Sequence, residues 1–168
     1  MNLIQEIVAW LESIFTGLSA GVQKPSQAFG ASQILATIRA RLTVPLGLPD
    51  AAAQALFAQA YLETDGFKAH EFLVTKSLWN RHAGSGKGYW TGSTFYVSPG
   101  DSDLRIYSSI AQSCMDMGEL LQDPYYSRSL AALQRGDVVD YFKSLEALGF
   151  STQKGYAFDL MRTFNDFA

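Results

Sequence analysis

Glu63 is the residue whose type and position most clearly suggest chemistry. The chain after Asp50 has the apolar spacing of a helix, with Leu56 and Ala60 on its apolar face. Because Glu63 follows Leu56 by about two helical turns, its carboxyl lies on that same face, near the carboxyl end of the helix. Apolar surroundings and the negative end of the helix dipole both disfavour the ionised carboxyl and raise its pKa. The sequence therefore predicts a general acid at Glu63; the alternative is a solvated carboxylate at a frayed helix end.

Other kinds of site have little support in the sequence. His70 and His82 are the two histidines and Cys114 is the one cysteine, so neither a zinc site nor an intrachain disulfide is expected. Cys114 is predicted to be a buried thiol. The glycine-rich residues 84–88 lack the spacing of a phosphate-binding loop, and no nucleophile-elbow sequence is present. We therefore expect no metal and no cofactor.

Length and composition indicate one compact domain with a short appendage. The 168 residues are 48% hydrophobic and 17% charged, which is enough apolar material for a core and too little charge for a disordered chain. The net charge of −3 offers no basic surface for nucleic acid, whereas the 13% of aromatic residues could supply rings for a sugar site. We expect neither a transmembrane span nor a secretory signal, so another system would deliver the protein to an extracellular target.

The elements that must position Glu63 are predicted to be mostly helices. Helical spacing covers 31–42, and a second helix runs from Asp50, as N-cap, to a stop at Gly66. Asp137 is a predicted N-cap and Gly149 a predicted residue just past a helix end. These signals belong to four further helices, expected at 108–121, 124–134, 137–148 and 155–166.

A glycine-rich stretch over 77–107 separates the early helices from the late ones. Its tyrosines, tryptophans, threonines and serines favour an irregular β-hairpin or β-lobe, with strands over 94–98 and 104–107. The predicted fold class is therefore α+β, mostly α with a small β-hairpin lobe.

The N-terminal residues form a separate unit in this interpretation. Apolar residues repeat at helical spacing over 3–18, opposite an acidic polar face, so residues 1–20 are predicted to be an amphipathic helix. It would pack on the protein's own core, dock on a partner protein or lie on a membrane surface, of which the acidic face favours the membrane least. Residues 21–30 are expected to be a linker, and residues 31–168 the main domain.

Five segments in order resemble motifs of glycoside hydrolase family 73, the flagellar and autolysin peptidoglycan N-acetylglucosaminidases. Members carry an A-x-x-x-E-T-x-x-G segment with the catalytic glutamate, then N-L-F-G, F-R-x-Y-x-S, N-P-x-Y and G-Y-A-T-x-x-x-Y-A segments. The similar segments here are residues 60–66 (AYLETDG), 77–80 (SLWN), 104–109 (LRIYSS), 123–126 (DPYY) and 149–157 (GFSTQKGYA). The resemblance covers about residues 50–168, and no single segment is specific.

The resemblance implies a lysozyme-like fold with the active cleft between helical and β lobes. It gives Glu63 the general-acid role and places Tyr156 where the family has a tyrosine that faces the cleft, to position the sugar or its acetamido group. The alternative for Tyr156 is a core aromatic at a helix start. Candidate substrate-binding aromatics, each with packing as its alternative, are Trp79, Trp90, Tyr96 and Tyr107, of which Tyr107 fits closure of the lobe onto the helices better.

One departure from the family concerns the second catalytic group. Phe95 stands where some members have a glutamate in the β-lobe, and a phenylalanine cannot activate water or stabilise an oxocarbenium ion. Asp101 or Asp103 could reach the cleft instead, although both have the composition of a turn. Otherwise the substrate's own 2-acetamido oxygen attacks the anomeric carbon. A third alternative is a weak or inactive enzyme.

The function implied is that of an endo-β-N-acetylglucosaminidase on the glycan strands of bacterial peptidoglycan. The enzymatic alternative is a muramidase or lytic transglycosylase, and the alternative from another class is a catalytically weak glycan-binding or assembly protein. The site of action would be the bacterial cell envelope or periplasm, or a phage particle. A protein partner is possible through the N-terminal helix.

Overall fold

A computed structural model describes residues 29–84, 88–99 and 102–167. The predicted N-terminal helix, most of the predicted linker and Asp101 lie outside the described residues. The helices are α2 (Ala31–Ile38), the π-helix η1 (Arg39–Thr43), α3 (Asp50–Glu63), α4 (His70–Thr75), α5 (Ile110–Gln122), the 3₁₀-helix η2 (Pro124–Tyr126), α6 (Ser127–Gln134), α7 (Val138–Ala147) and α8 (Tyr156–Asn165). The strands are β1 (Thr94–Phe95) and β2 (Leu104–Arg105).

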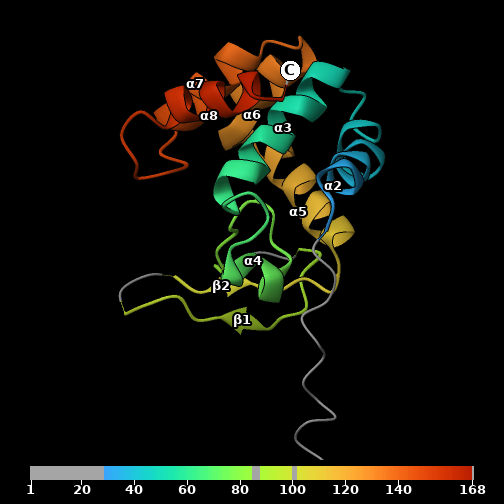
Figure 1. Ribbon diagram of the computed structural model, residues 1–168. Helices are drawn as coiled ribbons and strands as arrows, with labels where there is room; N and C mark the ends of the chain where they lie inside the picture. The colour runs from blue at the N-terminus through green and yellow to red at the C-terminus, as the bar shows by residue number, and fades with distance from the viewer. Residues whose placement is uncertain (1–28, 85–87, 100–101, 168) are drawn as a thin grey trace, which may run out of the picture.

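Helix α3 is the central element of the helical part. Figure 1 shows it between α2 and α5 on one side and α6, α7 and α8 on the other. Leu56 and all its alanines except Ala51 are fully buried, so neighbouring helices approach it closely on several sides. A helix that is apolar nearly all round belongs in the middle of a core. Glu63, at its last turn, is therefore carried out of the core to the boundary with the small lobe.

The end of α3 is built by a sharp reversal of the chain. Asp65, Gly66 and Phe67 follow one another with positive φ angles of 47°, 66° and 64°. The amide of Gly66 donates to the Tyr61 carbonyl at 2.8 Å, which closes the helix as the sequence predicted. A Cβ on Gly66 would lie 3.1 Å from the Tyr61 ring, so this position favours glycine for both reasons.

The helix caps partly match the prediction. The Asp137 carboxylate accepts from the Asp140 amide at 2.9 Å, and Gly149 has the positive φ of a residue just past a helix end, so both predictions are confirmed. The predicted N-cap at Asp50 is wrong, because Pro49 takes that position. The Asp50 carboxylate is held instead by the Arg39 guanidinium at 2.7 Å.

The small lobe contains less regular structure than predicted. Strands β1 and β2 pair antiparallel, Thr94 with Arg105 and Phe95 with Leu104, and each has two residues where the sequence indicated four or five. The short helix α4, which the sequence analysis did not predict, lies in the same lobe beside the strands (Figure 1). The mostly helical α+β class is confirmed.

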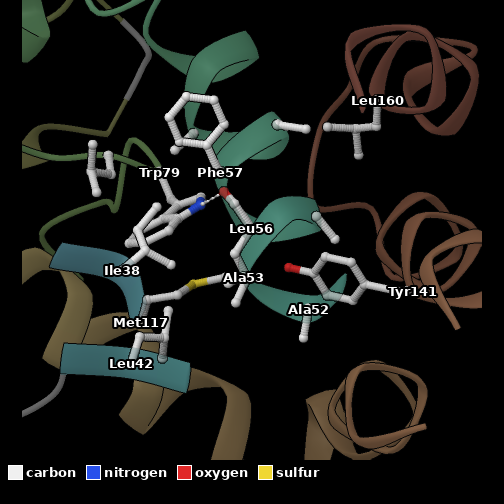
Figure 2. Packing of buried hydrophobic residues seen from close by; sticks show 14 of the residues in the cluster. Ile38, Leu42, Ala52, Ala53, Leu56, Phe57, Trp79, Met117, Tyr141 and Leu160 are labelled. Carbon is white, nitrogen blue, oxygen red and sulfur yellow. Dashed lines mark hydrogen bonds between the residues drawn. The ribbon is translucent and has the colours of Figure 1, made fainter. Parts of the chain in front are cut away.

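The core joins residues from both ends of the chain. Figure 2 shows Trp79 against α3, with its indole nitrogen directed at the Leu56 carbonyl, to which it donates at 3.3 Å. Cys114 is buried, and burial raises the pKa of its thiol to about 12, which confirms the predicted buried thiol. Phe29, at the end of the predicted linker, packs its ring 6.0 Å from that of Phe72. None of the helices within the described ranges is both long and apolar enough to cross a membrane.

Candidate active site

A cleft of about 980 Å³ lies where the helical part meets the small lobe. One wall comes from the end of α3 and the loop at 149–152, and the other from β2 and the segment that precedes the lobe. Residues that matter for its chemistry are Glu63, Glu71, Asn80, Arg81, His82, Asp123 and Tyr126. This volume is at the upper end of the range of small-molecule and cofactor sites.

The Glu63 carboxyl lies in the wall of this cleft with a partner on each oxygen. Oε1 accepts from the Tyr156 hydroxyl at 2.5 Å, and Oε2 accepts from the Asn80 side-chain amide at 3.3 Å. Burial raises the pKa of Glu63, and the hydrogen bonds from Tyr156 and Asn80 and the charge of His82 lower it only in part. The net effect is a raised pKa, in the direction that the sequence predicted and that proton donation near neutral pH requires.

Asn80 forms hydrogen bonds with Glu63, the last residue of α3. Its side-chain amide also donates to the Glu63 backbone carbonyl at 2.8 Å, so one residue holds both the main chain and the carboxyl. Asn80 has a φ of 43°, a left-handed conformation that asparagine adopts more readily than most residues. Asn80 was not predicted as a site residue. Its residue type and its place in the 77–80 segment were the features from which a contact with Glu63 could have been predicted.

Tyr156 lies beside Glu63, in a more buried position than predicted. It is 2% exposed, its ring stacks on Phe150 at 6.2 Å, and its hydroxyl contacts the carboxyl rather than the open cleft. The predicted role in positioning the sugar stays a prediction, and the contact that the structure gives is with the candidate acid.

The other aromatic residues predicted to bind substrate are either buried by packing or do not line the cleft. Trp79 borders the cleft but is only 1% exposed, and Tyr107 is fully buried with its hydroxyl 2.7 Å from Asp116. Packing, the alternative interpretation of both, agrees with these positions better than stacking on a sugar. Trp90 is half-buried beneath Arg105, whose guanidinium carbon is 5.4 Å from the ring centroid. Tyr96 is exposed on the lobe, and neither Trp90 nor Tyr96 is among the described residues that line the cleft.

A buried ionic cluster fastens the lobe to α5. Asp116, 1% exposed, accepts from Arg105 at 2.8 Å, from Arg81 at 3.1 Å and from the Tyr107 hydroxyl at 2.7 Å. A buried carboxylate with three donors is satisfied, whereas one without them would be costly. Since Arg81 follows Asn80, this cluster also fixes the segment that holds Glu63. Sequence reasoning missed it, because its members lie on separate elements.

Of the two aspartates predicted as a second catalytic group, only Asp103 is among the described residues. Asp103 accepts from the Thr94 hydroxyl at 2.9 Å, in agreement with a turn role, and it is not among the described residues that line the cleft. Phe95 packs near the His70 ring at 6.0 Å. Two carboxylates that the sequence analysis did not select, Glu71 and Asp123, do line the cleft. The Asp123 carboxylate accepts from the Tyr125 amide at 2.8 Å and so caps η2. Of these two carboxylates, Glu71 is therefore the one without a capping role.

Solved structures of peptidoglycan hydrolases share this fold. A peptidoglycan hydrolase from Sphingomonas sp. A1 is 27% identical over 78% of this chain and 83% of its own, with a TM-score of 0.62. The glycoside hydrolase domain of FlgJ from Salmonella typhimurium is 20% identical over 82% and 88%, with a TM-score of 0.58. The catalytic domain of the autolysin Auto from Listeria monocytogenes is 17% identical over 94% of both chains, with a TM-score of 0.56. No protein-family model and no curated protein matches the sequence.

These structures define the class of the fold. The chain has the lysozyme-like α+β fold, mostly helical with a small two-stranded lobe, as predicted. The resemblance to the peptidoglycan hydrolases of glycoside hydrolase family 73, first indicated by the order of five short motifs, is confirmed at the level of structure.

Proposed function

We propose that this protein is a peptidoglycan hydrolase that cleaves β-1,4 glycosidic bonds of the glycan strand, as an endo-β-N-acetylglucosaminidase, with Glu63 as general acid. The observation that carries the proposal is the Glu63 carboxyl: it lies in the wall of a cleft of about 980 Å³, and burial raises its pKa. The 27% identity to a peptidoglycan hydrolase with the same fold supports the choice of polymer.

The reaction begins with a proton on Glu63. The carboxyl gives it to the glycosidic oxygen as the bond to the anomeric carbon breaks, and the leaving sugar departs as an alcohol. The carboxylate that remains keeps its hydrogen bonds from Tyr156 and Asn80. Water finally supplies the hydroxyl of the new reducing end and returns a proton to Glu63.

The role of nucleophile in this first step is assigned to the substrate's own 2-acetamido group. Its carbonyl oxygen attacks the anomeric carbon as the leaving group departs, and water then opens the resulting ring. The apolar side chain at Phe95 and the turn role of Asp103 favour this route over a carboxylate from the strand region. Attack by water with Glu71 as base is the competing route, because Glu71 lines the same cleft.

Loss of the acid tests the proposal. Glu63→Gln is expected to lower the rate of cell-wall clearing by a factor of about 10² to 10⁴, the usual contribution of a positioned acid. The measurement is turbidity loss of purified cell walls, with Glu146→Gln, an exposed carboxylate on α7, as control. Clearing by the Glu63 variant at the native rate would remove Glu63 from the mechanism.

Mass spectrometry of the products decides the bond. Reducing-end N-acetylglucosamine supports the glucosaminidase, reducing-end N-acetylmuramic acid a muramidase, and anhydro-sugars a lytic transglycosylase. The transglycosylase is the second candidate, since it needs one acid–base glutamate and tolerates Phe95. Binding of glycan without any product would favour the binding or assembly role.

The substrate also places the proposed activity in the bacterial envelope or periplasm. A secretion apparatus, a phage particle or lysis would bring the protein there. A partner protein at the N-terminal residues 1–20 remains a proposal, since they lie outside the described structure.

A further inference from the structure

Three buried side chains form a chain of hydrogen bonds that ends on Glu63. The Tyr141 hydroxyl is 2.7 Å from Gln59 Oε1, Gln59 Nε2 is 3.5 Å from the Tyr156 hydroxyl, and that hydroxyl is 2.5 Å from Glu63 Oε1. Gln59 and Tyr141 are fully buried and Tyr156 is 2% exposed. The chain joins α7, α3 and α8, and Figure 2 shows the Tyr141 hydroxyl directed at α3. Neither Gln59 nor Tyr141 lines the cleft among the described residues.

The chemistry of the groups allows only one direction for these hydrogen bonds when Glu63 is ionised. A carboxylate only accepts, so the single proton of the Tyr156 hydroxyl must point at Glu63. The Tyr156 oxygen can then only accept from Gln59, which requires the amide nitrogen on that side. The amide oxygen therefore faces Tyr141, whose hydroxyl donates to it. Every donor in the chain points towards Glu63.

Protonation of Glu63 does not reverse this direction. The Tyr141 hydroxyl keeps donating to the Gln59 amide oxygen, so the Gln59 amide nitrogen still faces the Tyr156 oxygen and the Tyr156 proton is left for Glu63 Oε1. Oε1 is held by the short bond from Tyr156 at 2.5 Å, whereas the Asn80 amide lies farther from Oε2, at 3.3 Å, so the acidic proton goes to Oε2. This is the oxygen on the side of Asn80, a residue that lines the cleft.

We propose that Gln59 and Tyr141 are positioning residues that hold the Tyr156 hydroxyl as a donor to Glu63 Oε1, so that the catalytic proton sits on Oε2, the oxygen on the side of Asn80. Without Gln59, the Tyr156 hydroxyl can turn and accept from a protonated Oε1. The acidic proton is then directed into the protein instead of the cleft. This inference rests on the proposed function of Glu63 as the acid.

Gln59→Met tests the inference with little change of volume. The expected results are a fall in kcat on soluble glycan strands of about tenfold to a hundredfold, as for a misplaced catalytic group, and an upward move of the Glu63 pKa. The pKa is read both from the pH profile of kcat and from carbon-13 NMR titration of the Glu63 carboxyl in the full-length protein. Tyr141→Phe, which lets the Gln59 amide turn over, is expected to move both quantities the same way by less.

Ser129→Ala is the matched control for lost packing and stability. It removes a buried hydroxyl of α6 that lies 2.7 Å from Ser144 on α7. The Ser144 hydroxyl donates to the Tyr141 main-chain carbonyl, but neither serine side chain is part of the chain of hydrogen bonds to Glu63. Its Tm is expected to fall while the Glu63 pKa stays unchanged. Unchanged kcat and pKa in Gln59→Met, or an equal pKa change in Ser129→Ala, would overturn the inference.

The two readouts separate this inference from the proposed function. If the native protein cleaves no glycan, the function fails, while the NMR titration still tests the direction of the hydrogen bonds. If native protein cleaves and Glu63→Gln does not, but Gln59→Met behaves as native, only the inference fails. If Gln59→Met does not fold, Tyr141→Phe, which deletes one oxygen atom, decides the question by the same criteria.

Discussion

At the scale of single residues, Glu63 shows the conflict between stability and function that a buried acid creates. Its environment is apolar enough that ionisation is disfavoured, and the donors Tyr156 and Asn80 offset this only in part. Folding therefore raises the pKa of the group above its unfolded value. The contribution of Glu63 to the free energy of unfolding is fully present below its unfolded pKa, where the carboxyl is neutral. This contribution is lost as pH rises through the raised pKa of the folded protein.

This linkage predicts that Glu63→Gln stabilises the protein at alkaline pH. Below the ordinary carboxyl pKa of 4.5, native and variant proteins should have the same Tm, because Glu63 is neutral in both folded and unfolded chains. Above the raised pKa the variant should have the higher Tm, since it has no charge to bury. Thermal unfolding over a pH series measures the Tm of the native and variant proteins in both pH ranges. The control Glu146→Gln changes an exposed carboxylate and should leave the Tm equal to that of the native protein across the series. A lower Tm of the Glu63 variant at every pH would contradict the prediction.

At the scale of elements, the lobe and the helices are joined by the Asp116 cluster more than by strand pairing. Two residue pairs hold β1 to β2, whereas one buried carboxylate receives Arg81, Arg105 and a tyrosine. A close approach of the main chain at Gly88 covers this cluster. A Cβ there would lie 2.2 Å from Asp116 Oδ1 and 2.6 Å from Arg105.

Gly88→Ala is therefore expected to lower the free energy of unfolding by about 1 to 3 kcal/mol, because the added methyl displaces a satisfied buried ion pair. Urea unfolding measures the effect. Gly84→Ala is the matched control in the same lobe, since a Cβ at Gly84 meets no atom within 4 Å. Equal stability of the two variants would show that the cluster tolerates displacement.

At the scale of the whole molecule, the described core and the cleft are built from one continuous part of the chain. The described core extends from Ile34 to Leu160, and the cleft walls lie within the same part of the chain. Phe29 belongs to this body through its contact with Phe72, although the sequence placed it in a linker.

A protein that begins at Phe29 is expected to keep the Tm and the hydrolysis of soluble glycan strands of the full chain. The physical reason is that every described residue of the core and of the cleft lies after position 28. Thermal unfolding and a product assay on soluble strands make the comparison. Removal of Phe29 and Gly30 as well should lower the Tm, through the lost ring contact and the lost start of α2. Unfolding of the first truncation would make the N-terminal residues part of the domain.

What the sequence determined by itself was local. Helical spacing predicted α3 and its end, Asp137 and Gly149 marked their helix termini, and the position of Glu63 on an apolar face indicated its raised pKa. These features depend on residues a few positions apart, so the pattern of the chain contains them.

Only the tertiary structure decided what surrounds that carboxyl. Tyr156 lies 93 residues along the chain from Glu63, and Tyr141 lies 82 from Gln59. Asp103 and Tyr96 were predicted for the site and do not line the cleft, while Asn80, Glu71 and the Asp116 cluster were not foreseen in their roles. Which side chains meet across such separations is set by how the helices pack, and local spacing does not specify that packing.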